Sequence, residues 1–146
     1  MSWFIDLVSS QIFQSIISGV ILLFIGEYMK SFVLEPIKQY RGVIGKIDNK
    51  LKYYSNRITN SGLPEDYIKE ARESLRNLSC DLESAYKQIP SWSVQMIIFN
   101  LPCRKQVSDA ATKLIYLSNA AGDRGEELHN NNEMKAIRKL LKIQEL

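Results

Sequence analysis

The one histidine of this chain follows closely after an arginine, and the two side chains have chemistry suited to phosphate esters. Arg124 and His129 are separated by four residues in the segment DRGEELH. A guanidinium group binds phosphate oxygens in pairs, and an imidazole changes its charge near neutral pH. Any histidine-dependent mechanism would have to use His129, because the chain has no second histidine.

The spacing resembles the R-x4-6-H motif of the HEPN class of ribonucleases, which are small helical bundles. The resemblance implies that Arg124 binds the scissile phosphate and that His129 handles protons during attack by the RNA 2′-hydroxyl. Gly125 departs from the pattern, because active members usually carry a polar residue there. Glu126 and Glu127 would also repel RNA phosphate unless they are turned away.

A simpler interpretation of the same segment is a solvated loop. In that case the stretch GDRGEELHNNNE connects two helices, and Asn131 or Asn132 caps the last helix. This interpretation favours a chain that is not an enzyme, but the sequence leaves the question open. If it is one, the HEPN resemblance implies a ribonuclease that needs no metal.

The composition excludes several other kinds of site. One His and two Cys among 146 residues are too few for a zinc site of the usual kind. The chain has neither a glycine-rich phosphate loop nor a G-x-S-x-G motif. We therefore expect no metal and no cofactor. Cys80 is expected in or near a helical core and Cys103 at the start of a helix, both reduced in the cytosol.

The N-terminal part of the chain is suited to a membrane. The 20 residues from Leu7 to Gly26 carry no charge, and as a helix they would span about 30 Å. Trp3 and Phe4 precede this stretch and Tyr28 follows it, as interfacial anchors would. A cleaved signal peptide fits poorly, because no basic residue precedes the stretch and no small-residue cleavage site follows it. The other alternative is a buried helix of a soluble protein.

The distribution of positive charge predicts the orientation of this helix. All 19 Lys and Arg lie at or after Lys30. The positive-inside rule then places residues 30–146 in the cytoplasm of a bacterium and the N-terminus outside its inner membrane, with a single pass. Lys30, Lys38, Arg41 and Lys46 are expected at the membrane surface, against anionic headgroups. Their position favours lipid over nucleic acid as a partner.

The predicted membrane helix also carries polar residues at helical spacing. Gln11, Gln14, Ser15 and Ser18 fall within one sector, and Ser15 and Gly19 form a small-x-x-x-small pair. Buried amides and hydroxyls seek partners on other helices, and small residues let two helices approach closely. This face predicts a homo-oligomer and is a candidate lining for a pore. The alternative is a few tolerated polar residues near the outer interface.

The rest of the chain has the periodicity of amphipathic helices. Apolar residues recur at intervals of three and four, and no segment alternates as a strand would. We expect an all-α protein, with a transmembrane helix in residues 1–30 and a cytosolic four-helix, HEPN-like bundle in residues 31–146. The apolar stripes are Val33, Ile37, Tyr40, Ile44, Ile47, Leu51, Tyr54 and Ile58; Ile68, Ala71, Leu75, Leu78, Leu82, Ala85 and Ile89; Val107, Ala110, Leu114, Leu117 and Ala121; and Met134, Ile137, Leu140 and Leu141.

Proline and glycine mark the expected ends of these helices. Pro64 opens the second stripe, Pro90 ends it, Pro102 precedes the third and Gly122 follows it. Pro36 either kinks a helix or lies in the first turn of a new one. The apolar link from residue 91 to residue 101 either caps the bundle or contacts the membrane or a neighbouring subunit through Trp92.

Two resemblances extend this interpretation. The phrases LEPIKQYRGVIGKIDNKLKYYSN, ARESLRNLSCDLESAYKQIP, LPCRKQVSDAATKLIYLSN and IRKLLKI resemble a widespread family of small bacterial membrane-anchored proteins, which brings no established activity. The layout of one membrane helix, a small helical bundle and an R-x4-H element is similar to the membrane accessory proteins of type VI-B CRISPR loci. That resemblance implies an oligomeric pore supporting antiphage defence, with Arg124 and His129 as a divergent HEPN-like motif.

Three hypotheses about function follow. The first is an oligomeric membrane pore or membrane-disrupting effector in bacterial defence. The second is a membrane-tethered HEPN ribonuclease that uses Arg124 and His129. The third is a non-catalytic adaptor that tethers a cytosolic protein partner through the last helix, where Lys135, Arg138, Lys139 and Lys142 form a basic face.

Overall fold

The computed structural model describes residues 11–60, 63–90, 99–123 and 125–143, and all regular structure in these ranges is helical. The chain divides into two compact units that meet between Glu35 and Pro36. The sequence analysis expected a boundary after residue 30, whereas the first compact unit also includes the helical turn Lys30–Leu34. Trp3, Phe4, Arg124 and Trp92 lie outside the described residues.

The first unit contains the helix α2, Gln11–Met29, in which no residue is buried. Large apolar side chains face outward all round it, and Ile12 and Phe24 are 76% and 73% exposed. The helix is long and apolar enough to span a membrane. Among the described residues nothing buries this helix, which differs in this respect from the core helix of a soluble protein.

The helical backbone continues past Pro36 as far as Tyr53. Directly before the proline, Lys30–Leu34 forms a single π-helical turn, η1, and the Glu35 N–H donates to the Lys30 carbonyl. Proline has no N–H to donate to the carbonyl four residues earlier, and its ring crowds that carbonyl. A wider turn accommodates this defect without ending the helix. The helix α3, Glu35–Tyr53, therefore has Pro36 in its first turn.

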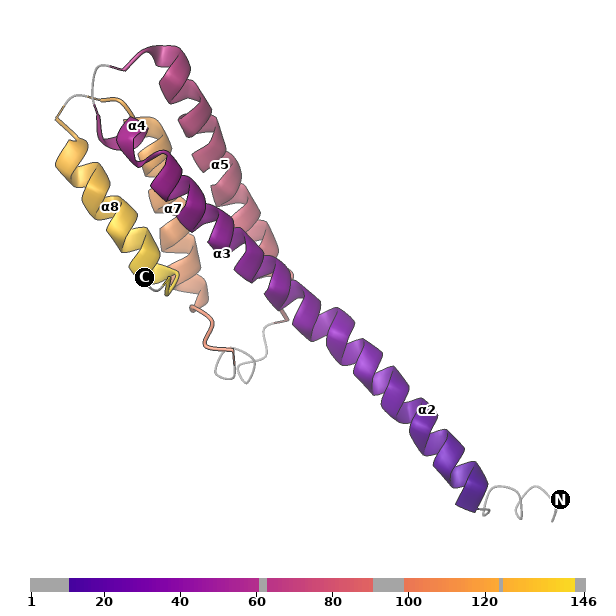
Figure 1. Cartoon of the computed structure of the whole chain (residues 1–146). Helices are drawn as coiled ribbons and strands as arrows, with labels where there is room; N and C mark the ends of the chain where they lie inside the picture. Colours follow the sequence, from indigo (N-terminus) through magenta and orange to yellow (C-terminus); the bar gives the residue numbers. More distant parts are fainter. Residues whose placement is uncertain (1–10, 61–62, 91–98, 124, 144–146) are drawn as a thin grey trace. The chain divides into compact units, whose positions relative to one another are not determined.

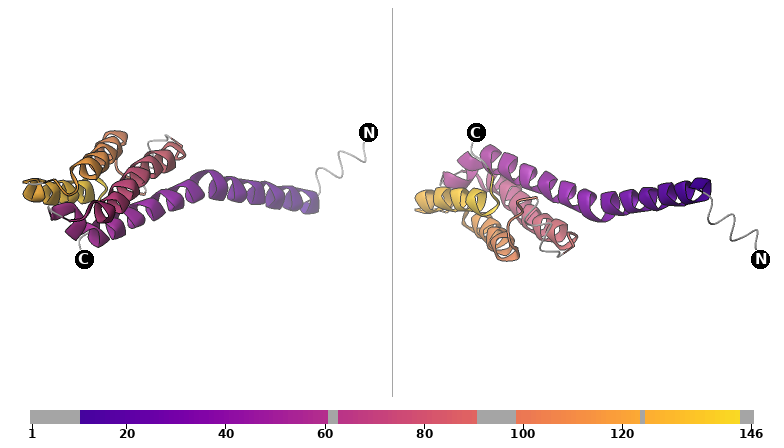
Figure 2. Two further views of the ribbon diagram at one scale, coloured as in Figure 1. Left: turned by 90° about the horizontal axis from the view of Figure 1, so that it is seen from above. Right: turned by 90° about the horizontal axis from the view of Figure 1, so that it is seen from below.

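The second unit is a helical bundle. After α3 come the short helix α4, Ser55–Thr59, and three longer helices: α5, Glu65–Lys87; α7, Arg104–Ala120; and α8, Glu127–Leu140. Helix α7 packs against both α5 and α8, and α3 lies across this group (Figure 1). The tyrosine rings of α3 and α5 meet at Tyr40 and Tyr86. The side chains of α3 and α8 meet at Asp48 and Arg138. Figure 2 shows the same helices from above and below.

The predicted apolar stripes form the core of this bundle. All members of the second and third stripes are buried, whereas Ile44 and Leu140 of the others are half-buried. Tyr86, Leu101 and Ala111 are further buried residues that the stripes did not include. The periodicity thus identifies most of the core, because one face of each helix is covered by its neighbours.

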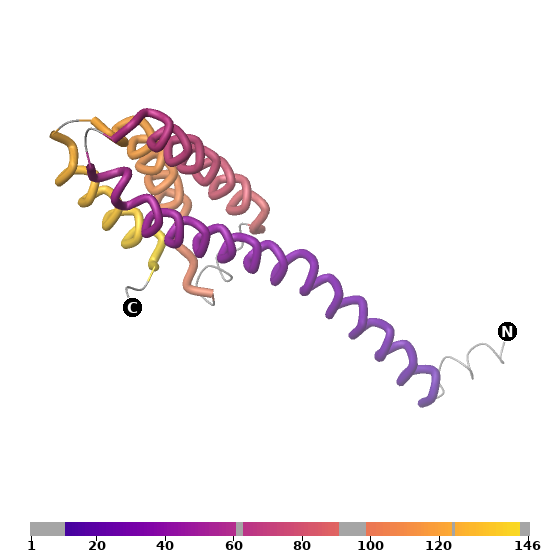
Figure 3. Tube along the Cα trace, turned by 45° about the horizontal axis from the view of Figure 1, so that its top comes forward, coloured from indigo at the N-terminus to yellow at the C-terminus, as the bar shows by residue number. Residues whose placement is uncertain are grey.

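The predicted helix ends are also confirmed. Pro64 stands directly before α5, which ends before Pro90, and Gly122 follows α7 with a φ of +83°. The first stripe differs, because the helix breaks at Tyr54 and resumes as α4 (Figure 3). Cys103 stands at the start of α7, as predicted, and its N–H donates to the side-chain oxygen of Gln106.

Two sequence-based predictions in this unit are wrong. Cys80 is exposed, because the buried face of α5 runs through its neighbours Ser79 and Leu82 and leaves position 80 outside. Neither Asn131 nor Asn132 caps the last helix. Helix α8 begins at Glu127, so both asparagines lie inside it and are exposed.

Candidate functional site

The polar residues predicted in the membrane helix share one face of α2. Gln11, Gln14, Ser15, Ser18 and Gly19 all belong to α2, and all are exposed. Positions separated by three, four and seven residues lie above one another on a helix. Gln14 and Ser18 line a shallow surface groove that neighbouring apolar side chains border. We call these five residues the polar face of α2.

Two glycines on α2 leave space for a second helix. A Cβ atom added at Gly19 or at Gly26 would meet nothing within 4 Å. Gly26 lies seven residues after Gly19 and therefore on the same side of α2, with the apolar Leu22 between them. The sequence analysis missed Gly26, although the seven-residue interval was the signal that could have identified it.

The basic residues predicted at a membrane surface are all exposed. Lys38 and Lys46 project from α3, and Lys30 lies 3.9 Å from Glu27. Arg41 differs from the others, because its guanidinium donates to the main-chain carbonyl of Phe99, 3.1 Å away. The prediction of a contact with headgroups stays a prediction for all four residues.

The imidazole of His129 lies in the first turns of α8 among acidic groups. It is 53% exposed, and its Nε2 is 3.8 Å from Glu133, whose other oxygen accepts from Lys113 at 2.6 Å. The ring also meets Tyr116 edge to face, and the Tyr116 hydroxyl donates to Glu126 at 3.1 Å. Burial and then the Glu126 hydrogen bond raise the pKa of Tyr116.

This neighbourhood is poorly suited to RNA. The carboxylates of Glu126 and Glu133 give this site negative charge, which would repel a phosphate backbone. Lys113 already pairs with Glu133. The predicted partner Arg124 lies outside the described residues, so the pair of Arg124 and His129 stays a prediction. In the described part of the chain, no group of His, Cys, Asp and Glu gathers as a metal site.

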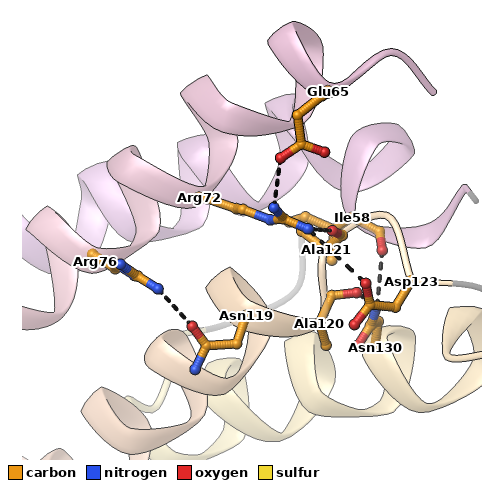
Figure 4. A network of polar contacts seen from close by, with 9 residues as sticks. All are labelled: Ile58, Glu65, Arg72, Arg76, Asn119, Ala120, Ala121, Asp123 and Asn130. Carbon is orange, nitrogen blue, oxygen red and sulfur yellow. Dashed lines mark hydrogen bonds and ion pairs between the residues drawn. The ribbon is translucent and has the colours of Figure 1, made fainter.

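A buried asparagine one residue after His129 has a structural role that the sequence analysis missed. Asn130 is fully buried, and its side-chain amide donates to the carbonyls of Ile58, at 2.9 Å, and Ala120, at 3.3 Å (Figure 4). These carbonyls belong to the last turns of α4 and α7, where a helix leaves carbonyls without a partner. One side chain therefore caps two helices.

Two arginines of α5 hold the same end of α7. Arg72 donates to the carbonyl of Ala121 at 2.8 Å and to Glu65 at 2.8 Å (Figure 4). Arg76 donates to the side chain of Asn119 at 2.7 Å. Hydrogen bonds from Asn130 and Arg72 to buried or half-buried carbonyls thus fix the turn that precedes His129. Its polar residues serve the fold, which is a different use from the phosphate chemistry suggested by their types.

A second cluster of polar and aromatic residues joins α4 to α5. The guanidinium of Arg57 lies 5.2–5.7 Å from the ring centres of Tyr53, Tyr54 and Tyr67, and it contacts Glu70 at 2.6 Å. The hydrogen bond from Arg57 lowers the pKa of Glu70. The cluster ties the short helix α4 to α5 and contains no nucleophile paired with a base.

No known protein family, curated protein or solved structure matches the chain. The function has to be inferred from the chain's own residues. The polar face of α2 is a feature that the described fold of a single chain leaves unexplained, whereas hydrogen bonds within the bundle hold the polar groups around His129.

Proposed function

We propose that the chain is a membrane-anchored helical bundle that self-associates through the polar face of α2, forming a pore or a membrane-disrupting assembly. One observation carries the proposal. Helix α2 has the length and apolarity of a membrane span and no buried residue, yet it presents two amides, two hydroxyls and a glycine on one face.

The physical argument concerns the cost of these groups in lipid. An amide placed in hydrocarbon without a hydrogen-bond partner costs several kcal/mol, of the order of 4–8 kcal/mol in alkane transfer. Gln11 and Gln14 can lower that cost by bonding to a second copy of α2 or to water inside a ring of helices. Gly19 and Gly26 have no side chain to hold a second helix away. Apart from their chain neighbours and the helix's own backbone, no described atom lies within 4 Å of the place a Cβ would take.

The orientation is part of the proposal. Every described residue that carries positive charge lies at or after Lys30, so the positive-inside rule favours a cytoplasmic bundle and an external N-terminus. A role in antiphage defence, which the layout resemblance implies, stays a prediction.

The experiment is dye or ion release from lipid vesicles that contain the purified chain. We expect release with the natural sequence and its loss in the double variant Gln14→Leu, Ser18→Leu, which removes an amide and a hydroxyl and keeps the helix apolar. The matched control is Ile16→Leu, Val20→Leu. Its two positions have the same four-residue spacing on the opposite side of α2. Carbonate extraction checks that every variant is inserted.

Two results would contradict the proposal. One is equal release by the natural chain and by the Gln14 and Ser18 variant at equal insertion. The other is the absence of release by the inserted natural chain at every protein-to-lipid ratio.

The two alternative functions stay predictions with their own tests. A ribonuclease that uses His129 would lose RNA cleavage in His129→Ala, whereas the pore would release dye as before. An adaptor would lose its cytosolic partner when the basic residues of α8 are changed. On that helix Arg138 is already committed to Asp48, at 2.9 Å, which leaves Lys135 and Lys139 as exposed cations.

A further inference from the structure

A cavity of about 450 Å3 lies on the bundle where α3, the segment before α7 and the end of α8 meet. Two of its lining residues are cations, Arg41 from α3 and Lys142 from the end of α8. No described residue of the lining is acidic. The volume is within the range of small-ligand pockets. Apolar side chains, including Ile44 and Leu141, form much of the remaining wall.

Both cations are held by oxygens that carry no formal charge. The Arg41 guanidinium donates to the Phe99 carbonyl at 3.1 Å. The Lys142 ammonium donates to the side-chain oxygen of Asn100 at 2.7 Å and to its carbonyl at 3.4 Å. Among the ion pairs of the described residues, none includes Arg41 or Lys142. Within the described chain, two positive charges therefore share one cavity without a carboxylate.

The backbone is strained at this same cavity. Asn100 has a φ of 51° and Lys142 a φ of 55°, and no other non-glycine residue of the described ranges has a positive φ. Lys142 follows α8 in the position where glycine is usual, since the Ile143 N–H donates to the Arg138 carbonyl and closes a Schellman turn. A side chain in this conformation costs about 1 kcal/mol. This helix end places Lys142 in the lining of the cavity.

We propose that this cavity binds a phosphate group through Arg41 and Lys142. The planar guanidinium matches two phosphate oxygens, and the ammonium adds a point charge from the turn after α8. The apolar wall is suited to the carbon part of a phosphate ester. Two sources carry this chemistry, the headgroup of an anionic phospholipid and a soluble phosphate. The inference does not depend on self-association of α2.

The test measures thermal unfolding of the full chain in phosphatidylcholine nanodiscs. One arm adds inorganic phosphate, with chloride at equal ionic strength as the reference. The other arm replaces part of the lipid by phosphatidylglycerol. A ligand that binds the folded state raises the midpoint of unfolding in proportion to its occupancy.

Two variants remove one cation each. Arg41→Gln removes the guanidinium. Lys142→Gly removes the ammonium and suits the left-handed backbone, so the bundle keeps or gains stability. The matched controls are Lys46→Gln on α3 and Lys139→Gln on α8, which are exposed residues outside the lining.

We expect each cavity variant to show a smaller midpoint shift, corresponding to an affinity for phosphate about tenfold lower, because one charge-assisted contact is lost. The control variants should respond as the natural chain does. A shift with inorganic phosphate assigns a soluble source, and a shift with phosphatidylglycerol alone assigns a lipid. The proposal is overturned if neither arm shifts the midpoint, or if the control variants lose the shift as fully as Arg41→Gln and Lys142→Gly do.

Discussion

Helices α2 and α5 are similar in length, 19 and 23 residues, but they differ in which side chains they bury and which they expose. Helix α5 buries one apolar face and exposes charged residues on the other. Helix α2 buries nothing and exposes apolar residues all round, with polar residues on one side of its N-terminal half. This inversion is what we expect if water surrounds α5 and, as proposed, lipid surrounds α2.

The comparison also shows where each helix finds partners for its polar groups. In the bundle, Asn130, Arg72 and Ser79 donate to carbonyls of neighbouring helices in the same chain. On α2, the amides of Gln11 and Gln14 project from a helix with no buried residue. If lipid surrounds α2, those amides need partners from other copies or from water. Substitutions should therefore act on stability in the bundle and on association in α2.

The largest expected effect is at Asn130. Asn130→Asp removes the donor that caps α4 and α7 and sets a carboxylate against two carbonyls, so we expect a loss of about 3 kcal/mol in the free energy of unfolding. The measurement is urea denaturation of the full chain in mild detergent. Asn132→Asp, an exposed site on the same helix, is the control and should change little. Equal losses at the two sites would remove the capping role.

The next effect is at Gly122. This residue has a φ of +83°, and a Cβ atom there would overlap the Cδ1 of Ile68. We expect Gly122→Ala to cost about 2 kcal/mol, from backbone strain and displacement of a core side chain. Gly19→Ala on α2 meets nothing and should leave the bundle's unfolding unchanged while it weakens association. A Gly122→Ala variant as stable as the natural chain would contradict the core packing described for this turn.

A smaller effect depends on pH. Burial opposes ionisation of Asp48, but hydrogen bonds from Lys52 and Arg138 outweigh it and hold its pKa below the ordinary value. A lowered pKa gives stability that is present above the ordinary value, near 4, and is lost as the pH falls through the folded value. We expect Asp48→Asn to lower the free energy of unfolding by about 1–2 kcal/mol at pH 7. The stability of this variant should also fall less steeply as the pH is lowered. If stability depended on pH in the same way with and without Asp48, the ion pair between Asp48 and Arg138 would contribute nothing to stability.

The smallest effect is a gain. The Tyr40 hydroxyl is buried and has no hydrogen-bond partner in the described chain, and burial followed by the nearby Tyr86 raises its pKa. Tyr40→Phe removes an unpaired polar group and keeps the ring packing, so we expect about 1 kcal/mol of added stability. A loss of stability in Tyr40→Phe would mean that the hydroxyl has a partner.

The helices and most of the core could be predicted from sequence because their signal is local. Apolar residues that recur every three or four positions show which face each helix buries. Pro64, Pro102 and Gly122 mark where the helices begin or end. Asn130 could not be predicted in this way. Its neighbours are polar and typical of a loop, and its partners Ile58 and Ala120 are brought to it only by the packing of α4 and α7.

The candidate sites follow the same division. The polar face of α2 could be predicted, since it needs only helical spacing within one segment. The cavity between Arg41 and Lys142 could not, because the two residues are far apart in sequence and meet through the segment before α7. Residue type alone also suggested phosphate chemistry at His129, where the fold gathers carboxylates instead.

The most direct test of the central claim is the mass of the purified chain in mild detergent, from light scattering corrected for bound detergent. The account predicts an assembly larger than a tetramer, because four helices pack into a bundle whose interior side chains fill. It also predicts that Gln14→Leu, Ser18→Leu reduces this mass while Ile16→Leu, Val20→Leu does not. A monomer for the natural chain, or the same mass for all three proteins, would contradict self-association through the polar face of α2.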